Sequence, residues 1–338
     1  MVLSFLFLTL TLATLSSATY NCKNEIVNLQ NPNPYYYPAT WNEQRPAPVL
    51  GANNSCSFTI LVPQGHYAKL VMSTEVGDKN SSIRIIDAYN NLYDGSHEMK
   101  NPWYFPYNRF LIIVNNGAPA KFAFKVNWAQ YPSGVQLSAA ISKKPRVVSI
   151  TKNVFTAQFH AVTGLSLLAF PEDLSYLYAL RSTFVFEGDD FNGHYVDSLY
   201  NLYLAHKQWI TKKNIYIVNV EARGALDQLL VQEAGYTQAI DPYQQMSCNP
   251  SSTCYRYLGT GNPASGLVYV GNQTQTLLDI SIPWNSTLSV YYGTPTSSNL
   301  YKTYDGTSIR SMLPLKFSAE VVQYIVNGGV TTYNFKFS

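Results

Sequence analysis

The chain has 338 residues, of which 46% are hydrophobic and 14% aromatic, so it can bury a sizeable core. This composition excludes a disordered chain and a miniprotein held together by disulfides alone. Charged residues make up only 13%, and 23 Lys and Arg against 20 Asp and Glu leave a formal net charge of +3. The basic runs at 143–146 and 212–213 are too short for a phosphate-binding stripe, so we expect no nucleic-acid partner.

Residues 1–18 have the pattern of a secretory signal peptide. They contain no charged side chain, have an apolar run from Leu3 to Leu12, and end in Ser16-Ser17-Ala18. A membrane anchor is the alternative, but Thr and Ser interrupt the run, which is short for a spanning helix. No later segment is apolar enough to span a membrane, so we expect a secreted, extracellular chain.

Four Asn-x-Ser/Thr sequons agree with secretion, at Asn53, Asn80, Asn272 and Asn285. Isolated sequons also arise by chance in a chain rich in Asn and Ser. Together with the signal peptide, they predict that at least some of the four carry glycans.

The four cysteines, Cys22, Cys56, Cys248 and Cys254, allow three pairings. We expect Cys22 to pair with Cys56 and Cys248 with Cys254, because this keeps each bridge within one region of the chain. Each bridge would restrict the unfolded chain, the longer first loop more than the short second one. Neither Cys-x-x-Cys nor a His pair flanks these positions, so we expect structural disulfides, no metal site and no cofactor.

Apolar residues alternate with polar ones from Ser57 onward, which is typical of half-buried strands. The Asn-Asn-Gly-Ala-Pro segment at 115–119 predicts a hairpin turn between two such runs. Two stretches, 196–210 and 225–234, are compatible with short helices. The sequence predicts strands within 58–62, 70–72, 83–85, 110–114, 122–128, 147–153, 184–186, 215–220, 267–270, 277–282 and 288–292, and hence a mainly β fold.

Pro132, Gly134 and Pro145 indicate a domain boundary. We therefore expect a β-sandwich in residues 19–131, a linker in 132–146, and a second β-rich region in 147–338. The second region would be a related sandwich or two smaller units.

The predicted closing hairpin of the first half recurs at the C-terminus. Ile113-Val114-Asn115-Asn116-Gly117 leads into 122–126, and Ile325-Val326-Asn327-Gly328-Gly329 leads into 333–337. The two readings are duplication of one sandwich type and chance, since hairpins with Asn-Gly turns are common. Under duplication, Ile217-Val218-Asn219 is a degenerate third copy.

Several of these features resemble the nematode CUB-like domain family of secreted proteins. They are Cys22, the run Tyr35-Tyr36-Tyr37-Pro38-Ala39-Thr40-Trp41, the segment from Cys56 to Leu70, and the run from Phe122 to Trp128. The resemblance covers about residues 20–131. It implies a β-sandwich, an extracellular location, a first disulfide on Cys22 and Cys56, and membership of a group associated with innate defence and stress responses.

The chain departs from the original CUB domain, which has a second disulfide and an acidic calcium site. No third or fourth cysteine precedes Ile141. Glu75, Asp87 and Asp94 are acidic residues in the corresponding region. They lie on different predicted segments, so we expect solvated surface acids and not a calcium cage.

Most enzyme signatures are missing from the sequence. Gly164-Leu165-Ser166-Leu167-Leu168 lacks the second glycine of a nucleophile elbow, and the five His are too scattered for a metalloprotease motif. A carbohydrate hydrolase needs only two suitably spaced carboxylates. The loop 187–193, with Asp189 and Asp190, is the best candidate for that pair, although an exposed turn has the same composition.

The 27 Tyr are the residues that a binding function would use. Tyr35, Tyr36 and Tyr37 are consecutive, so we expect at least one to be exposed. The sequence favours a secreted, glycosylated, non-enzymatic binding protein of innate defence, whose extracellular ligand is a microbial surface glycan or a host protein. The alternatives are a secreted carbohydrate-acting hydrolase and a luminal or matrix structural glycoprotein with cross-linked tyrosines.

Overall fold

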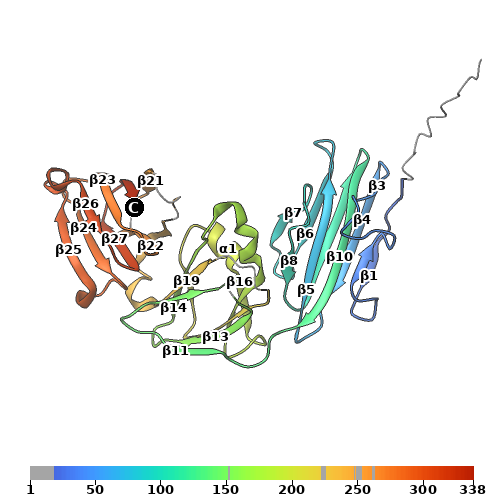
Figure 1. Cartoon of the computed structure of the whole chain (residues 1–338), viewed down its shortest axis with the longest axis horizontal. Helices are drawn as coiled ribbons and strands as arrows, with labels where there is room; N and C mark the ends of the chain where they lie inside the picture. The colour runs from blue at the N-terminus through green and yellow to red at the C-terminus, as the bar shows by residue number, and fades with distance from the viewer. Residues whose placement is uncertain (1–18, 151–152, 222–225, 247, 249–252, 261–262) are drawn as a thin grey trace, which may run out of the picture. The chain divides into compact units, whose positions relative to one another are not determined.

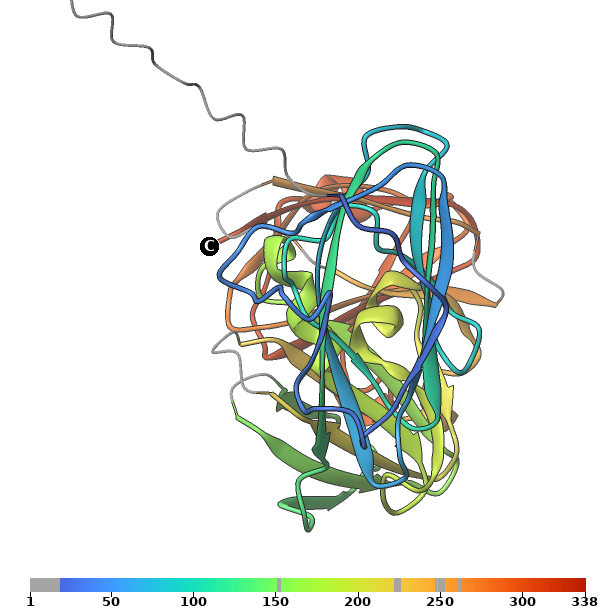
Figure 2. The same ribbon diagram turned by 90° about the vertical axis from the view of Figure 1, so that its right-hand side faces the viewer.

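A computed structural model describes residues 19–150, 153–221, 226–246, 248, 253–260 and 263–338. The chain divides into two compact units. Unit 1 holds the described residues up to Val62 together with Lys69–Asn101 and Asn108–Trp128, and unit 2 holds Pro63–Ala68, Pro102–Tyr107 and Ala129–Ser338. The described residues form six sheets, which confirms the mainly β class (Figures 1 and 2).

The first pair of sheets is called sandwich 1. Its mixed sheet, so named because its edge pair is parallel, has the order β1 (Glu25–Val27), β4 (Asn54–Leu61), β9 (Arg109–Asn116), β6 (Ser82–Ile86) and β7 (Leu92–Asp94). Its second sheet has the order β2 (Tyr35–Tyr37), β10 (Ala120–Gln130), β5 (His66–Glu75) and β8 (Trp103–Phe105), with β3 (Val49–Leu50) beside β10. Tyr37 and Phe58 pack across the sandwich with ring centroids 4.4 Å apart.

Sandwich 2 lies in unit 2. Its mixed sheet has the order β11 (Leu137–Ala140), β13 (Phe155–His160), β18 (Asn214–Asn219), β15 (Thr183–Glu187) and β16 (His194–Ser198). Its second sheet has the order β12 (Arg146–Ser149), β19 (Gln228–Glu233), β14 (Leu165–Phe170) and β17 (Trp209–Thr211). The helical elements are η1 (Leu174–Ser182), α1 (Leu199–Leu204) and η2 (Ala234–Tyr236).

Sandwich 3 completes unit 2. Its mixed sheet has the order β20 (Ile240–Gln245), β22 (Ala264–Val270), β27 (Val321–Asn327), β24 (Thr287–Tyr292) and β25 (Leu300–Asp305). Its second sheet has the order β21 (Thr253–Leu258), β28 (Thr331–Phe337), β23 (Gln275–Ser281) and β26 (Leu315–Phe317). Two short helical turns, η3 (Ser297–Asn299) and η4 (Ile309–Met312), lie in its loops.

The three sandwiches share one strand order. In each mixed sheet the first strand of the sandwich lies parallel to its neighbour at the edge, and each second sheet ends in a strand equivalent to β8. The repeated sequence segments lie on equivalent strands, β9 and β10 in sandwich 1 and β27 and β28 in sandwich 3. Ile217-Val218-Asn219 lies on the third equivalent, β18.

The predicted hairpin at 115–119 is wrong, because β9 belongs to the mixed sheet and β10 to the second sheet. The same holds for β27 and β28. An Asn-Gly hairpin turn requires a positive φ at both central residues, but neither Asn116 nor Gly117 has one. Asn116 instead points inward, where its Nδ2 donates to the carbonyl oxygens of Gly51 and Ala118 at 2.7 and 2.6 Å. The repeat is therefore a connection between sheets.

Three further expectations agree with the structure only in part or not at all. The stretch 225–234 contains strand β19 and no α-helix among its described residues, because it alternates inward Leu229 and Val231 with outward Leu230 and Gln232. The stretch 196–210 forms a helix only in its middle, at α1. The predicted linker at 132–146 contains strand β11, which pairs with β13.

Sandwiches 2 and 3 pack through a dry interface between the second sheet of sandwich 2 and the mixed sheet of sandwich 3. Its apolar part includes Leu168, Phe170 and Leu230 from sandwich 2 and Val268 and Ile325 from sandwich 3. A closed triangle of hydrogen bonds between Gln232, Tyr243 and Gln323 lies within it, and all three side chains are completely buried. Every polar group that this triangle buries is thus paired.

Candidate functional site

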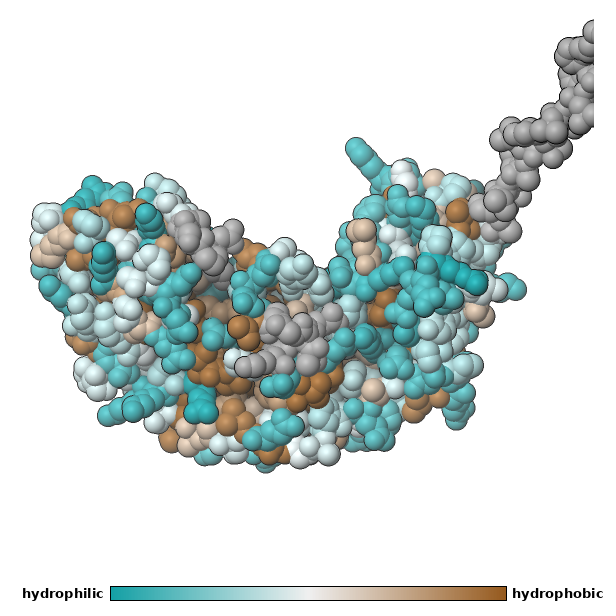
Figure 3. Space-filling model, in the orientation of Figure 1, coloured by the Kyte–Doolittle hydropathy of each residue, from teal (hydrophilic) through white to brown (hydrophobic). Residues whose placement is uncertain are grey.

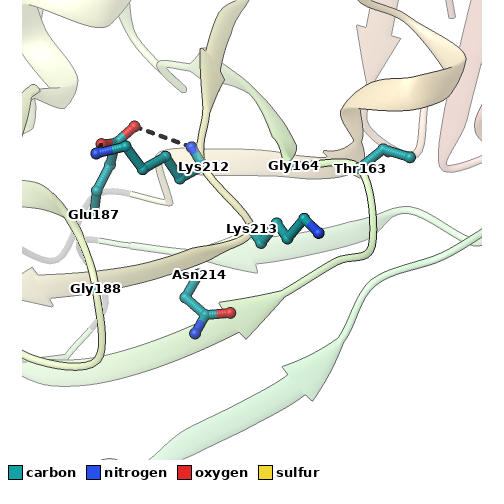
Figure 4. A pocket seen from close by; sticks show the side chains of 7 residues that line it. All are labelled: Thr163, Gly164, Glu187, Gly188, Lys212, Lys213 and Asn214. Atoms are coloured by element: carbon teal, nitrogen blue, oxygen red, sulfur yellow. Dashed lines mark hydrogen bonds and ion pairs between the residues drawn. The ribbon is translucent and has the colours of Figure 1, made fainter.

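The acidic loop 187–193 adjoins an open depression of about 490 Å³ in sandwich 2. Figure 4 shows its lining residues, Thr163, Gly164, Glu187, Gly188, Lys212, Lys213 and Asn214. Glu187 supplies the one carboxylate among them. Its Oε2 lies 3.0 Å from Nζ of Lys212, and its Oε1 accepts the main-chain N–H of Lys212 at 3.0 Å. Both oxygens are therefore engaged, and this carboxylate is not poised as a general acid or base.

Asp189 and Asp190 are both exposed at the surface. Asp189 accepts hydrogen bonds from the side chains of Gln158 and Asn214, and Asp190 accepts the main-chain N–H of Asn192 at 2.8 Å. These contacts are those of a turn that shapes its own backbone. A glycosidase acid must be shielded from water to keep its proton at neutral pH. The geometry therefore favours the structural interpretation of the loop over the hydrolytic one.

The structure does not bring Glu75, Asp87 and Asp94 together as a calcium cage. Lys121 donates to Glu75 at 2.6 Å and lowers the pKa of that carboxyl. Asp87 accepts the main-chain N–H groups of Tyr89 and Asn91. Hydrogen bonds from Ser96 lower the pKa of Asp94. Among the residues that the structure describes, no three His, Cys, Asp or Glu side chains are grouped as metal ligands would be.

Both disulfides have the pairing expected from the sequence, Cys22 with Cys56 and Cys248 with Cys254. Cys56 lies on β4 in sandwich 1, and Cys254 lies on β21 in sandwich 3. The first bridge spans 34 residues and the second only 6. The second joins Cys254, near the start of β21, to Cys248, which follows β20.

The side chains of the four sequon asparagines, Asn53, Asn80, Asn272 and Asn285, are all exposed, each outside a strand. Glycosylation at these positions stays a prediction. The predicted signal peptide, residues 1–18, lies outside the described residues. Within the described part of the chain, no helix has the length and apolar character to cross a membrane.

The expectation that one of Tyr35, Tyr36 and Tyr37 is exposed is wrong, because all three are half-buried on β2. Tyr37 and Tyr35 face the core of sandwich 1. Tyr36 faces outward, but Trp41 packs edge-on against it at 6.2 Å, and Nζ of Lys125 lies 5.8 Å from its ring centroid. Residues that follow β2 thus cover this face.

Two other tyrosines are the most exposed ones in the part of the chain that the structure describes. Tyr255 and Tyr257, on β21 of sandwich 3, are 72% and 65% exposed. They alternate with buried Cys254 and Leu258, so both rings point out of the sandwich. The alternation in Cys-Tyr-Arg-Tyr-Leu is the one sequence signal that could have identified them.

Comparison with known families identifies the N-terminal part of the chain. Residues 17–132 match the CUB-like domain. This part of the chain is similar to CUB-like domains. Residues 235–338, which include sandwich 3, match a domain of unknown function, DUF7591.

The solved structures that match the chain do so with low TM-scores. The CUB1-EGF-CUB2 domains of rat MASP-1 are 7% identical, with a TM-score of 0.24, and the match covers 62% of this chain and 99% of that one. The CUB1-EGF-CUB2 domain of human MASP-1/3 is 9% identical, with a TM-score of 0.22, over 54% and 94% of the two chains.

The full extracellular region of zebrafish Gpr126/Adgrg6 is 8% identical, with a TM-score of 0.25, over 95% of this chain and 53% of that one. No curated protein matches the chain. These structural likenesses are too weak to add to the family match.

Proposed function

We propose that the protein is secreted and acts outside the cell as a non-enzymatic binding protein in defence against microbes. The match of residues 17–132 to the CUB-like domain carries this proposal, because CUB domains are typically interaction modules. The two disulfides support an oxidising, extracellular environment. The signal-peptide pattern of residues 1–18 points the same way.

The surface also suits recognition. Figure 3 shows mainly hydrophilic and near-neutral residues where Figure 1 draws β24 and β25. With only 13% charged residues, uncharged polar and tyrosine side chains contribute much of this polarity. Tyrosine offers a flat apolar ring together with a hydroxyl, which fits both sugars and proteins. The ligand that we propose is a microbial surface glycan, with a host protein as the alternative.

The experiment is retention of the purified, glycosylated protein on whole bacteria, fungal wall and animal mucin, with calcium and with a chelator. An unrelated secreted glycoprotein is the control. Saturable retention on microbial material is the expected result. Retention no greater than that of the control would overturn the proposal of microbial binding. Loss of retention in the presence of chelator would show that binding needs a calcium ion.

A hydrolase is the second candidate function, and it depends on the acidic loop 187–193 of sandwich 2. Substitution of Asp189 and Asp190 tests it in any preparation that hydrolyses a glycan. Full activity in the Asp189→Asn/Asp190→Asn variant would remove this loop as an active site. The third candidate, a cross-linked matrix protein, requires dityrosine in the native material.

A further inference from the structure

The outer face of the second sheet of sandwich 3 carries tyrosine and lysine side chains in a regular lattice. Lys316 on β26, Thr276 on β23 and Lys336 on β28 are neighbours in one row across the sheet. The next row holds Asn334 opposite Tyr255, and the row beyond it holds Tyr257. These six residues define the tyrosine–lysine face, and β21, β23 and β26 are labelled in Figure 1.

The strand geometry fixes the spacing on this face. Tyr255 and Tyr257 are two residues apart, so their Cα atoms lie about 6.7 Å apart along β21. Lys316 and Lys336 are separated by one strand, which places their backbones about 9.6 Å apart. Both lysines are exposed. The exposed carboxylate of Asp279 lies opposite Asn334 in the row of Tyr255, so two lysines against one carboxylate leave the face with a small net positive charge.

The tyrosine–lysine face differs from the equivalent face of sandwich 2. There the second sheet presents Leu168, Phe170 and Leu230, and sandwich 3 covers them completely. The tyrosine–lysine face instead has threonine, asparagine and lysine on the strands beside its two exposed rings. Its chemistry suits a hydroxylated, water-soluble ligand better than another apolar sheet.

In sandwich 1 the equivalent outer face is covered by other residues of the chain, and these residues show which chemical groups fit such a face. Tyr36 lies on β2, the equivalent of β21, and Lys125 lies opposite it on β10. Trp41 supplies a ring against Tyr36, and the carboxylate of Glu43 pairs with Nζ of Lys125 at 2.7 Å. The cover is therefore a flat ring with a carboxylate beside it. In sandwich 3, Lys336 is diagonal to Tyr255, and both side chains are exposed.

We propose that the tyrosine–lysine face binds an acidic polysaccharide built from hexuronate sugars. The apolar side of each sugar ring stacks on Tyr255 and Tyr257, while its carboxylates pair with Lys336 and Lys316. Hydroxyl groups of the sugar meet Asn334, which lies opposite Tyr255, and Thr276, which lies between the two lysines. None of these six residues belongs to a sequon, so glycans on the protein itself leave their side chains unmodified. This inference rests on the proposed binding function and names the ligand class.

The test measures binding of the full-length glycosylated protein to polygalacturonate by titration calorimetry. Neutral dextran and polyglutamate, a peptide polyanion, are the comparison polymers. We expect binding to polygalacturonate that weakens with salt, and little binding to either comparison polymer. The Tyr255→Ala/Tyr257→Ala variant is expected to bind about tenfold more weakly. The Lys316→Gln/Lys336→Gln variant should weaken binding similarly.

Two matched variants test whether the loss of binding is specific to the tyrosine–lysine face. Tyr255→Phe/Tyr257→Phe keeps both rings and should retain most of the affinity. Lys302→Gln removes one exposed charge from β25 in the mixed sheet of the same sandwich and should leave binding unchanged. The substituted side chains are all exposed, and far-ultraviolet circular dichroism checks that each variant is folded.

The outcomes separate this inference from the proposed function. If polygalacturonate does not bind, or if the alanine variant binds it normally, the inference is overturned, whereas retention on microbes would still support the proposed function. If polyglutamate binds equally well, charge attraction alone would explain the binding, and the proposed sugar site would be overturned. Self-association that the alanine variant abolishes would assign the face to a second copy of the chain. If the protein binds polygalacturonate but is not retained on microbes, the proposed polysaccharide site would be supported and the proposed microbial ligand would be overturned.

Discussion

The hydroxyl of Tyr243 donates a 2.5 Å hydrogen bond to Oε1 of Gln323, and both side chains are completely buried. Gln232 closes the triangle, since its Nε2 donates to the Tyr243 hydroxyl at 2.9 Å and its Oε1 accepts from Nε2 of Gln323 at 2.6 Å. Gln232 belongs to sandwich 2, while Tyr243 and Gln323 belong to sandwich 3. The triangle therefore fixes the register of one sandwich on the other.

Removal of the Tyr243 hydroxyl should destabilise unit 2. Tyr243→Phe leaves a buried donor on Gln232 and a buried acceptor on Gln323 without this partner, at a cost of about 1–3 kcal/mol. Denaturant unfolding measures the loss. Tyr301→Phe, at a half-exposed ring, is the control and should change little. Unchanged stability of Tyr243→Phe would contradict the role given to the triangle.

Gly266 should not tolerate a side chain. A Cβ at this position would lie 2.5 Å from Cδ2 of Tyr243 and 2.9 Å from Cδ1 of Ile325. Because the Tyr243 ring lies against the glycine backbone, Gly266→Ala should overpack the interface and cost about 1–3 kcal/mol. Gly117→Ala, where a Cβ meets no atom within 4 Å, is the matched control. Equal thermal midpoints for the two variants would refute this explanation.

Alkaline pH should unfold the protein through its buried tyrosines. Burial raises the pKa values of Tyr243, Tyr324 and Tyr333 above the ordinary value of about 10. A folded-state pKa above the unfolded one means that stability is complete below about pH 10 and falls as pH rises beyond it. The exposed tyrosines should therefore ionise before the protein unfolds. The rest of the rise in tyrosinate absorbance, from the buried tyrosines, should coincide with unfolding. Full ionisation of all tyrosines in the folded protein would contradict this expectation.

The two disulfides should differ in their contribution to stability. In the chain-entropy model, the bridge that spans 34 residues contributes about 4 kcal/mol and the one that spans 6 about 2 kcal/mol. Cys22→Ala/Cys56→Ala should therefore lower the free energy of unfolding of sandwich 1 more than Cys248→Ala/Cys254→Ala lowers that of sandwich 3. Denaturant titrations of the two double variants test the order, and the reverse order would be evidence against the entropic account.

Asn53, Asn80, Asn272 and Asn285 should carry N-linked glycans in material secreted from a eukaryotic host. The side chains of all four are exposed, so a glycan can project into solvent. Enzymatic deglycosylation followed by intact mass measurement counts the occupied sites, and single Asn→Gln variants assign them. A mass that does not change on deglycosylation would count against glycosylation of this chain.

Strand positions were predictable because alternation with period two separates inward from outward residues. Phe122, Phe124 and Val126 are buried in β10 as that pattern requires. The pairing of strands was not predictable from the same pattern. A turn rich in Asn and Gly can connect neighbours in one sheet or strands in two sheets. The local backbone does not decide between them, since Gly328 and Gly329 both have a positive φ and still lead from β27 to a strand of the other sheet.

The sequence repeat predicted the related folds but not the register in sandwich 2. Val114 and Val326 face the cores of sandwiches 1 and 3, whereas the corresponding residue Val218 faces outward and Ile217 faces inward. A shift of one residue exchanges the faces of a strand. Composition likewise did not distinguish exposed Tyr255 from buried Tyr333, since both lie in alternating strands.

The interface between sandwiches 2 and 3 has a mechanical consequence. Its polar triangle is enclosed by apolar side chains, so water has no easy route to replace these hydrogen bonds. A force that pulls sandwich 3 away from sandwich 2 would have to break all three bonds together with the surrounding apolar contacts. Sandwich 2 would share that load, and the attachment would resist pulling for longer than sandwich 3 alone.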